Sequence, residues 1–196
     1  MKYIISRIPY LLAVLFVINC GPPNPNVNIS TGIGDIIIEL YPDKAPLTAA
    51  NFLRYIDEDL FRDARFYRTV TLDNQPYNDV KIEVIQGGLF ADDYVLPPIP
   101  HETTSMTGLR HLDGTVSMAR LEPGTASSEI FICIGDQPAL DFGGMRNPDG
   151  QGFAAFGRVI SGMEVVRKIH ALPESGQYLE PHLFIKSITR IDIKSP

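Results

Sequence analysis

Short apolar runs separated by glycine and proline fill most of the chain after residue 28. The 196 residues include 16 glycines and 16 prolines, and these two residue types interrupt regular structure more strongly than any others. Strand-like runs between such breaks favour a β-rich fold over a helical bundle. The predicted strands cover residues 34–41, 64–70, 80–86, 115–119, 129–134, 153–160 and 184–193.

Two segments show helical features instead. Apolar residues recur at helical spacing over about residues 46–58, and Pro46 suits the first turn, where a backbone N–H has no partner within the helix. Ser161 and Glu164 match a capping box, which predicts the start of a second helix. Many strands with two helices indicate a closed β-barrel capped by helices, because closure removes exposed sheet edges. The pattern alone also fits a sandwich.

The N-terminal segment has the layout of a secretory signal. Lys2 and Arg7 form a positive start, and residues 8–18 are then apolar and uncharged. A membrane-spanning helix needs about 20 apolar residues, so this run is too short to span permanently. We therefore predict that residues 1–19 are a signal peptide.

Cys20 follows this apolar stretch in a segment that resembles the cleavage box of bacterial lipoproteins. The box reads Val17-Ile18-Asn19-Cys20, with Ile18 and Asn19 where small residues are usual. The resemblance implies that Cys20 becomes the first residue and carries a lipid, and that residues 20–28 form a Pro- and Asn-rich spacer. It implies a lipid-anchored protein of the cell envelope. The alternative is a soluble secreted or periplasmic protein with a free cysteine.

The remainder of the chain is acidic. Without residues 1–19 it has 15 basic and 23 acidic residues, a formal net charge of −8. This charge argues against nucleic-acid binding, which depends on neutralising phosphates, and against docking on anionic lipid by charge alone. The second cysteine, Cys133, lies in the apolar run 131–134 and is predicted to be an inert core thiol.

Six short motifs occur in the order found in the cyclophilins. They are Ala49-Ala50-Asn51-Phe52, Phe66-Tyr67-Arg68, Gln86-Gly87-Gly88, Gly114-Thr115-Val116-Ser117-Met118-Ala119, Ser128-Glu129-Ile130-Phe131-Ile132, and Phe156-Gly157-Arg158-Val159 followed by Gly162-Met163. Residues 29–196 therefore resemble a cyclophilin-type peptidyl-prolyl cis–trans isomerase domain. The resemblance implies a mainly β fold, a closed eight-stranded antiparallel β-barrel capped by two α-helices. It also implies acceleration of rotation about X–Pro peptide bonds, with X–Pro-containing polypeptides as partners and a monomeric protein.

The resemblance assigns two catalytic residues. Arg68 is expected to donate a hydrogen bond to the twisted amide, and Gln86 to bind the substrate backbone and hold Arg68. Rotation about an amide cuts no bond, so neither a metal nor a cofactor is expected.

Eight further positions are expected to contact the substrate. Three of them match the lining of the proline pocket, with plain core packing as the alternative: Val84, Phe131 and Leu140. A fourth, Phe153, stands where many family members have histidine and can wall the pocket. The remaining expected contacts are Phe66, Ala119, Arg120 and Glu129, of which Arg120 replaces a family asparagine.

Other departures from the family concern the pocket itself. An insertion at about residues 71–81 separates Arg68 from Gln86 by more than the family norm. Glu83 stands where a pocket phenylalanine is expected, and Glu129 replaces a glutamine. These changes predict a shallower and more acidic pocket. They leave open a catalytically weak or inactive module that binds Pro-containing segments as a chaperone or envelope scaffold.

A metal-dependent hydrolase is the remaining alternative. It would use the four histidines as ligands, but their spacings match no common metal motif. The pair His101-Glu102, which follows a proline-rich run, is predicted to lie in a solvated loop.

Overall fold

The computed structural model describes residues 23–90 and 94–192. The strands are β1 Asn26–Thr31, β2 Asp35–Leu40, β3 Arg65–Val70, β4 Val84–Gly88, β5 Thr115–Met118, β6 Ile130–Cys133, β7 Ala154–Ser161, β8 Glu174–Ser175 and β9 Tyr178–Ile191. The helices are α1 Pro46–Asp57, α2 Thr104–Thr107 and α3 Met163–His170, with a 3₁₀ turn, η2, at Pro138–Leu140.

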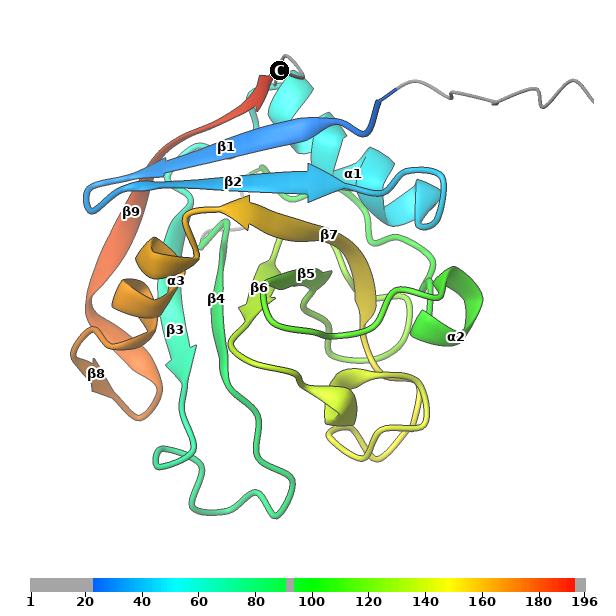
Figure 1. The fold of residues 1–196 in the computed structure, drawn as a ribbon, viewed down its shortest axis with the longest axis vertical. Helices are drawn as coiled ribbons and strands as arrows, with labels where there is room; N and C mark the ends of the chain where they lie inside the picture. Colours follow the sequence, from blue (N-terminus) through cyan, green and yellow to red (C-terminus); the bar gives the residue numbers. More distant parts are fainter. Residues whose placement is uncertain (1–22, 91–93, 193–196) are drawn as a thin grey trace, which may run out of the picture.

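Eight of the strands close into an antiparallel barrel (Figure 1). Their order is β1, β2, β7, β5, β6, β4, β3 and β9, and β9 pairs again with β1. The two-residue strand β8 pairs only with β9. The predicted mainly β, eight-stranded closed barrel is confirmed, and the sandwich alternative is excluded.

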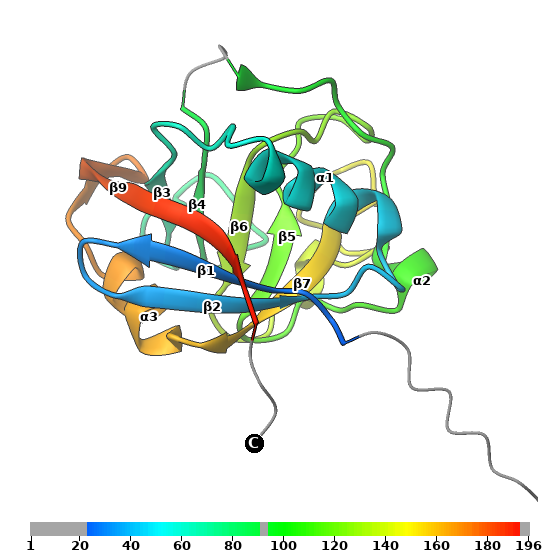
Figure 2. The same cartoon turned by 90° about the horizontal axis from the view of Figure 1, so that it is seen from above.

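Two helices close the barrel on different sides (Figure 2). Helix α1 contacts β7 and β9, and its Phe52 ring packs against Phe156 of β7 at a centroid distance of 5.4 Å. Helix α3 contacts β2, β3 and β4 and buries Val165, Val166 and Ile169. The sequence predicted these two helices but not α2, because four residues are too few to show a periodicity.

The barrel begins earlier than the sequence predicted. Strand β1 starts at Asn26, inside residues 20–28, which were assigned to a spacer. Val27 is fully buried, and it lies opposite Ile38 of β2 and Arg190 of β9. The asparagines on either side of Val27 are the partly exposed members of the alternation, and their polar composition concealed the strand.

The capping box predicted for α3 is wrong. The N-cap residue is Gly162 rather than Ser161, and no side chain caps the helix. Gly162 adopts a left-handed backbone with φ of 92°, and a Cβ there would collide with the Asp35 carbonyl oxygen. The close approach of β2 therefore selects glycine at this helix start.

A distant carboxylate caps α1. Glu102 accepts hydrogen bonds from the Leu47 N–H at 3.2 Å and the Thr48 N–H at 2.8 Å, and also from the Thr48 hydroxyl at 2.6 Å. Only 6% of Glu102 is exposed, so its assignment to a solvated loop is wrong. A negative charge at a helix N-terminus complements the helix dipole and satisfies N–H groups that lack partners within the helix.

Residues 1–22 lie outside the described part of the chain, and with them the predicted signal peptide and Cys20. In residues 23–90 and 94–192, no helix has both the length and the apolar character needed to cross a membrane.

Replacing Glu102 by alanine is expected to lower the free energy of unfolding by about 1–3 kcal/mol, because the buried Thr48 N–H loses its acceptor. Urea unfolding followed by circular dichroism measures the change. The matched control is Glu122→Ala, which removes an exposed carboxylate and should leave the unfolding midpoint unchanged. Equal stability of the two variants would mean that the α1 cap contributes nothing.

Candidate active site

A cavity of about 490 Å³ opens on the barrel beside β3, β4 and β6. It contains nine of the ten residues that the sequence assigned to catalysis or substrate binding. They are Arg68, Val84, Gln86, Ala119, Arg120, Glu129, Phe131, Leu140 and Phe153. Segments far apart in the sequence therefore meet at one site.

The tenth residue, Phe66, was wrongly assigned to substrate binding. Its side chain is fully buried in the main core of the barrel. The register between β3 and β4 shifts between Phe66 and Arg68. This irregularity lets Phe66 point into the core while Arg68 faces the cavity.

An apolar cluster forms the floor of the cavity. Its buried members are Val70, Ile82, Val84, Phe131, Cys133 and Leu140, with Ala119, Ala139 and Phe153 packed against them. The Phe131 ring meets the Phe153 ring edge to face at a centroid distance of 5.3 Å. A concave apolar surface of this kind suits a proline ring, which buries without leaving a polar group unpaired. Burial raises the pKa of the Cys133 thiol, so it stays protonated.

The floor is less acidic than the sequence predicted. Ile82, 7% exposed, lines the cavity, whereas Glu83 is not among the lining residues. Gln75 from the insertion holds Ile82 in place, because its amide donates to the Ile82 carbonyl at 2.8 Å and accepts from the Ile82 N–H at 3.3 Å. These side-chain bonds also explain why β4 begins at Val84 rather than near residue 80.

Although the insertion separates Arg68 from Gln86 along the chain, the two residues remain adjacent in space. Both residues lie opposite each other on paired strands, and the extra residues form a loop beyond the strand ends. The Arg68 Nη1 donates to the Gln86 Oε1 at 2.8 Å. Arg146, which also lines the cavity, fixes the loop by donating to the Gln75 Oε1 at 2.9 Å and to the Val80 carbonyl at 2.7 Å.

Glu129 acts on Gln86 rather than on Arg68 directly. Its Oε2 accepts from the Gln86 Nε2 at 2.7 Å and from the Tyr67 hydroxyl at 2.6 Å. Because a carboxylate only accepts, the amide nitrogen of Gln86 must face Glu129 and its oxygen must face Arg68. Burial and the adjacent Glu129 charge raise the pKa of Tyr67, which keeps its hydroxyl as a donor.

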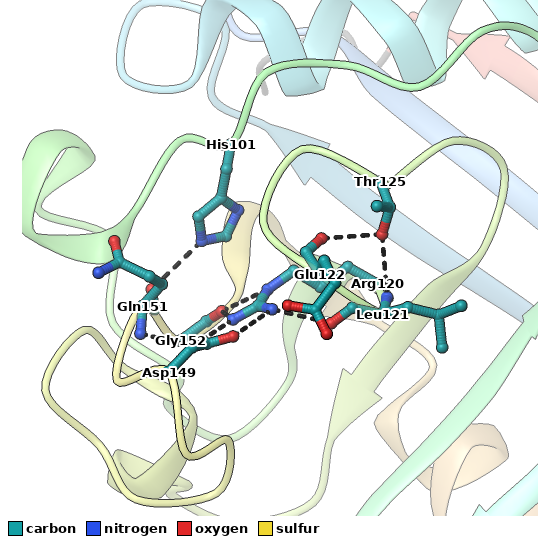
Figure 3. A network of polar contacts seen from close by, with 8 residues as sticks. All are labelled: His101, Arg120, Leu121, Glu122, Thr125, Asp149, Gln151 and Gly152. Atoms are coloured by element: carbon teal, nitrogen blue, oxygen red, sulfur yellow. Dashed lines mark hydrogen bonds and ion pairs between the residues drawn. The ribbon is translucent and has the colours of Figure 1, made fainter.

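The Arg120 side chain anchors a loop instead of reaching into solvent (Figure 3). Only 1% of it is exposed. It donates twice to the Gly152 carbonyl, at 2.6 and 2.8 Å, and pairs with both oxygens of Asp149 at 2.8 and 2.9 Å. Its guanidinium also lies 5.1 Å from the centre of the Phe153 ring. Arg120 therefore positions one wall of the cavity.

Three polar residues support the Phe131 ring from behind; His111 and Ser117 are buried, and Asp141 is partly buried. The His111 ring stacks on Phe131 at 5.8 Å, its Nδ1 lies 2.8 Å from the Asp141 carboxylate, and its Nε2 lies 3.0 Å from the Ser117 hydroxyl. Ser117 is fully buried and cannot meet a substrate. The geometry fixes the Phe131 ring and offers no nucleophile.

The histidines serve separate structural contacts. His101 approaches the Gln151 carbonyl at 3.2 Å, and His170 approaches the Val70 carbonyl at 3.0 Å. His182 packs edge-on against Phe90. Across the described residues, no three side chains of histidine, cysteine or acid form a group able to hold a metal ion. Nothing in their placement supports the hydrolase alternative.

Sequence reasoning missed two residues that contact Gln86 or Arg68, namely Tyr67 and Gln177. Tyr67 lies within the Phe66-Tyr67-Arg68 motif, but its contact with Glu129 depends on the pairing of strands across the sheet. Gln177 accepts from Arg68 and comes from the turn before β9, more than a hundred positions away. No local signal in the sequence marks such a contact.

Replacing Arg120 by alanine is expected to lower the free energy of unfolding. Its two bonds to the Gly152 carbonyl are charge-assisted, and one such bond contributes about 1.5–3 kcal/mol. Hydrogen bonds from Arg120 also lower the pKa of Asp149. The stabilising contribution of Asp149 is therefore present above the ordinary carboxyl pKa of about 3.9 and lost as the pH falls below it.

Urea unfolding at neutral pH and at about pH 3 should show a smaller difference between parent and variant at the lower pH. The control is Arg158→Ala, an exposed arginine of β7, which should change the midpoint little. A difference independent of pH would contradict the assigned role of Asp149.

Comparisons with known proteins point to one family. Residues 26–190 match the family model described as cyclophilin type peptidyl-prolyl cis-trans isomerase/CLD. A peptidyl-prolyl cis-trans isomerase of Acinetobacter baylyi is 32% identical over 176 residues, covering 87% of this chain and 85% of that protein. Peptidyl-prolyl cis-trans isomerase B of Escherichia coli is 34% identical over 173 residues, covering 83% and 98%.

Solved structures show the same fold. A cyclophilin type peptidyl-prolyl cis-trans isomerase of Cryptosporidium parvum superposes with a TM-score of 0.71 at 21% identity, covering 87% of this chain and 99% of that one. A second structure of that protein, determined in the presence of the dipeptide Ala-Pro, has a TM-score of 0.69. The family match spans most of the chain, and the relatives exceed 30% identity over most of their length. This chain belongs to the cyclophilin-type peptidyl-prolyl cis–trans isomerase family.

Proposed function

We propose that this protein accelerates rotation about X–Pro peptide bonds in exported polypeptides, with Arg68 as the central catalytic residue and Gln86 as its partner. The observation that carries the proposal is the position of the Arg68 guanidinium, which lines the same cavity as the apolar floor around Phe131. We expect a proline ring seated on that floor to bring its amide nitrogen towards the Arg68 guanidinium.

The reaction requires only a groove and a fixed donor. The amide resists rotation by about 18–20 kcal/mol because conjugation must be broken. As the bond twists, the prolyl nitrogen regains a lone pair, and a donor aimed at it stabilises the twisted state more than either planar form. Rotation breaks no covalent bond, so the residues on the cavity wall suffice.

The expected contribution of Arg68 is bounded by ordinary hydrogen-bond energies. A hydrogen bond to a charged group contributes about 1.5–3 kcal/mol, which corresponds to roughly 10- to 150-fold in rate at about 1.4 kcal/mol per decade. The groove supplies the remainder by holding the proline ring while the preceding residue turns.

The proposed substrates are polypeptides that contain proline. The Ala-Pro dipeptide used with the Cryptosporidium parvum protein is the same chemical class. We propose that the protein acts as a monomer, because a single chain already brings Arg68, Gln86 and the apolar floor around Phe131 to one cavity. Its acidic charge favours polypeptide over nucleic-acid partners.

The proposed location is the cell envelope, where a lipid on Cys20 would hold the protein. The support is the sequence alone: a positive start, an apolar stretch and a cysteine directly after it. A soluble periplasmic or secreted protein is the alternative outcome.

Arg68→Ala is expected to lower kcat/KM for a short X–Pro peptide at least about tenfold, because the twisted amide loses its donor. The measurement uses the domain from Pro23 onward and follows the cis-to-trans rate. Arg68→Lys is the matched variant: it keeps the charge but cannot bind both glutamines, so its rate should also fall.

A folded parent domain without catalysis would contradict the proposal. So would full activity in Arg68→Ala. If the folded parent domain does not catalyse rotation, the alternative is a module that only binds Pro-containing segments. Calorimetry with a Pro-containing peptide would then detect that binding.

Cys20→Ser is expected to move the full-length protein from the membrane fraction to the soluble envelope fraction, because a serine cannot carry the thioether-linked lipid. Fractionation of cells expressing each form measures the change, and Cys133→Ala, which adds no polar group to the apolar floor, serves as the control for the loss of a thiol. A parent protein already found in the soluble fraction would contradict the lipid anchor.

A further inference from the structure

We infer that Gln177, at the turn between β8 and β9, is a positioning residue that sets the direction in which Arg68 donates. The inference deepens the proposed function and rests on it. Neither the family resemblance nor any short motif points to Gln177, which joins the site only through the fold.

The guanidinium is held at both edges. Its Nε and Nη2 donate to the Gln177 Oε1 at 3.0 and 2.6 Å, and its Nη1 donates to the Gln86 Oε1 at 2.8 Å. An arginine has five N–H groups. Three of these N–H groups donate to the two glutamines. The second N–H of Nη1 and the second N–H of Nη2 have no partner among the described residues. The two glutamines thus fix the plane of the guanidinium and leave two donors for the cavity.

Gln177 is itself held firmly. Its Nε2 donates to the Asn74 carbonyl at 3.0 Å, and its backbone N–H donates to the Glu174 carboxylate at 2.6 Å. Its carbonyl accepts from the Thr69 N–H of β3 at 2.9 Å. Since the amide nitrogen must face the Asn74 carbonyl, the amide oxygen must face Arg68.

The backbone at Gln177 supports a role for its side chain. Ser175 pairs with Tyr178 across the turn, and the two residues between them, Gly176 and Gln177, have φ of 58° and 77°. Both left-handed positions of such a tight turn favour glycine, asparagine or aspartate. A glutamine at the second one is conformationally costly, and non-glycine residues held in this region often belong to functional sites.

The inserted loop supports Gln177 through its residue Asn74. Asn74 belongs to the insertion, and its side chain binds the Thr71 N–H at 2.9 Å and the Thr69 carbonyl at 3.1 Å. The Asn74 carbonyl is thereby fixed as the acceptor for Gln177. The loop after β3 and the β8–β9 turn lie at the same end of the barrel in Figure 1, and together they form a support for Arg68.

Two variants separate positioning from stability. Gln177→Gly removes the acceptor but suits the left-handed backbone. Gln177→Asn also tolerates that backbone, yet its side chain is one methylene too short to hold Arg68 in the same place. Ser175→Ala, an exposed residue of the same hairpin, is the matched control. All are compared with Arg68→Ala under conditions where circular dichroism shows each variant folded.

The expected result is a fall of about tenfold in kcat for both Gln177 variants, the size of one hydrogen bond to a charged group. KM should stay within about twofold, because substrate binding depends mainly on the apolar floor. In ¹⁵N-resolved NMR spectra, the Arg68 Nε–H signal should be sharp in the parent and in Ser175→Ala. It should broaden or vanish in both Gln177 variants.

Two results would overturn the inference. One is full kcat in both Gln177 variants while Arg68→Ala is impaired. The other is an equal loss in Ser175→Ala, which would assign the effect to the hairpin as a whole. Full activity in Arg68→Ala would instead refute the catalytic role of Arg68, so failure of the proposed function is recognised separately.

Discussion

Strand β9 pairs with β3 near its start and with β1 along the rest of its length, and this double pairing closes the barrel. Closure leaves no long unpaired edge among the barrel strands. It also fixes β3 between β4 and β9, so that Arg68 has Gln86 on one side and the β8–β9 turn on the other. The position of Arg68 is therefore a consequence of barrel closure.

The site combines two kinds of stabilisation. The apolar floor around Phe131 is buried and packed like the core, so it selects ligands by shape. Next to it, a chain of hydrogen bonds runs from Tyr67 and Glu129 through Gln86 to Arg68, and continues to Gln177 and Asn74. Because each amide in this chain has one permitted orientation, the donors of Arg68 are oriented before a substrate arrives.

The strand pattern indicated a β-rich fold, and the resemblance to the family predicted the barrel and most of the cavity. Apolar runs bounded by turn residues identified strands such as β2, and the ordered motifs predicted that Arg68, Gln86 and Phe131 lie together. The sequence-based predictions failed where polar residues form part of a strand or cap a helix. Asn26 and Asn28 concealed β1, and Glu102 resembled a solvated loop residue although it caps α1.

The remaining misses concern contacts between segments far apart in the chain. Glu83 and Ile82 are neighbours, and contacts from other segments determine that Ile82 lines the cavity: the bonds from Gln75 to Ile82 and the bond from the Ile134 N–H to the Glu83 carbonyl. The contact between Gln177 and Arg68 forms only when β9 pairs with β3 and closes the barrel. Neither spacing nor composition encodes these contacts, because a side chain's partner across the fold is set by the packing of several elements at once.

The cluster of Arg120, Asp149 and Phe153 has a consequence for how this protein changes in evolution. Positions 120 and 153 both depart from the family pattern, and the structure joins the two departures in one contact, with the guanidinium over the ring. Residues in direct contact do not contribute additively. A family-like asparagine at position 120 would leave Phe153 without its cation, and a histidine at position 153 would face a fixed positive charge. The effects of substituting positions 120 and 153 are therefore coupled, and a reversion at one of them changes the environment of the other.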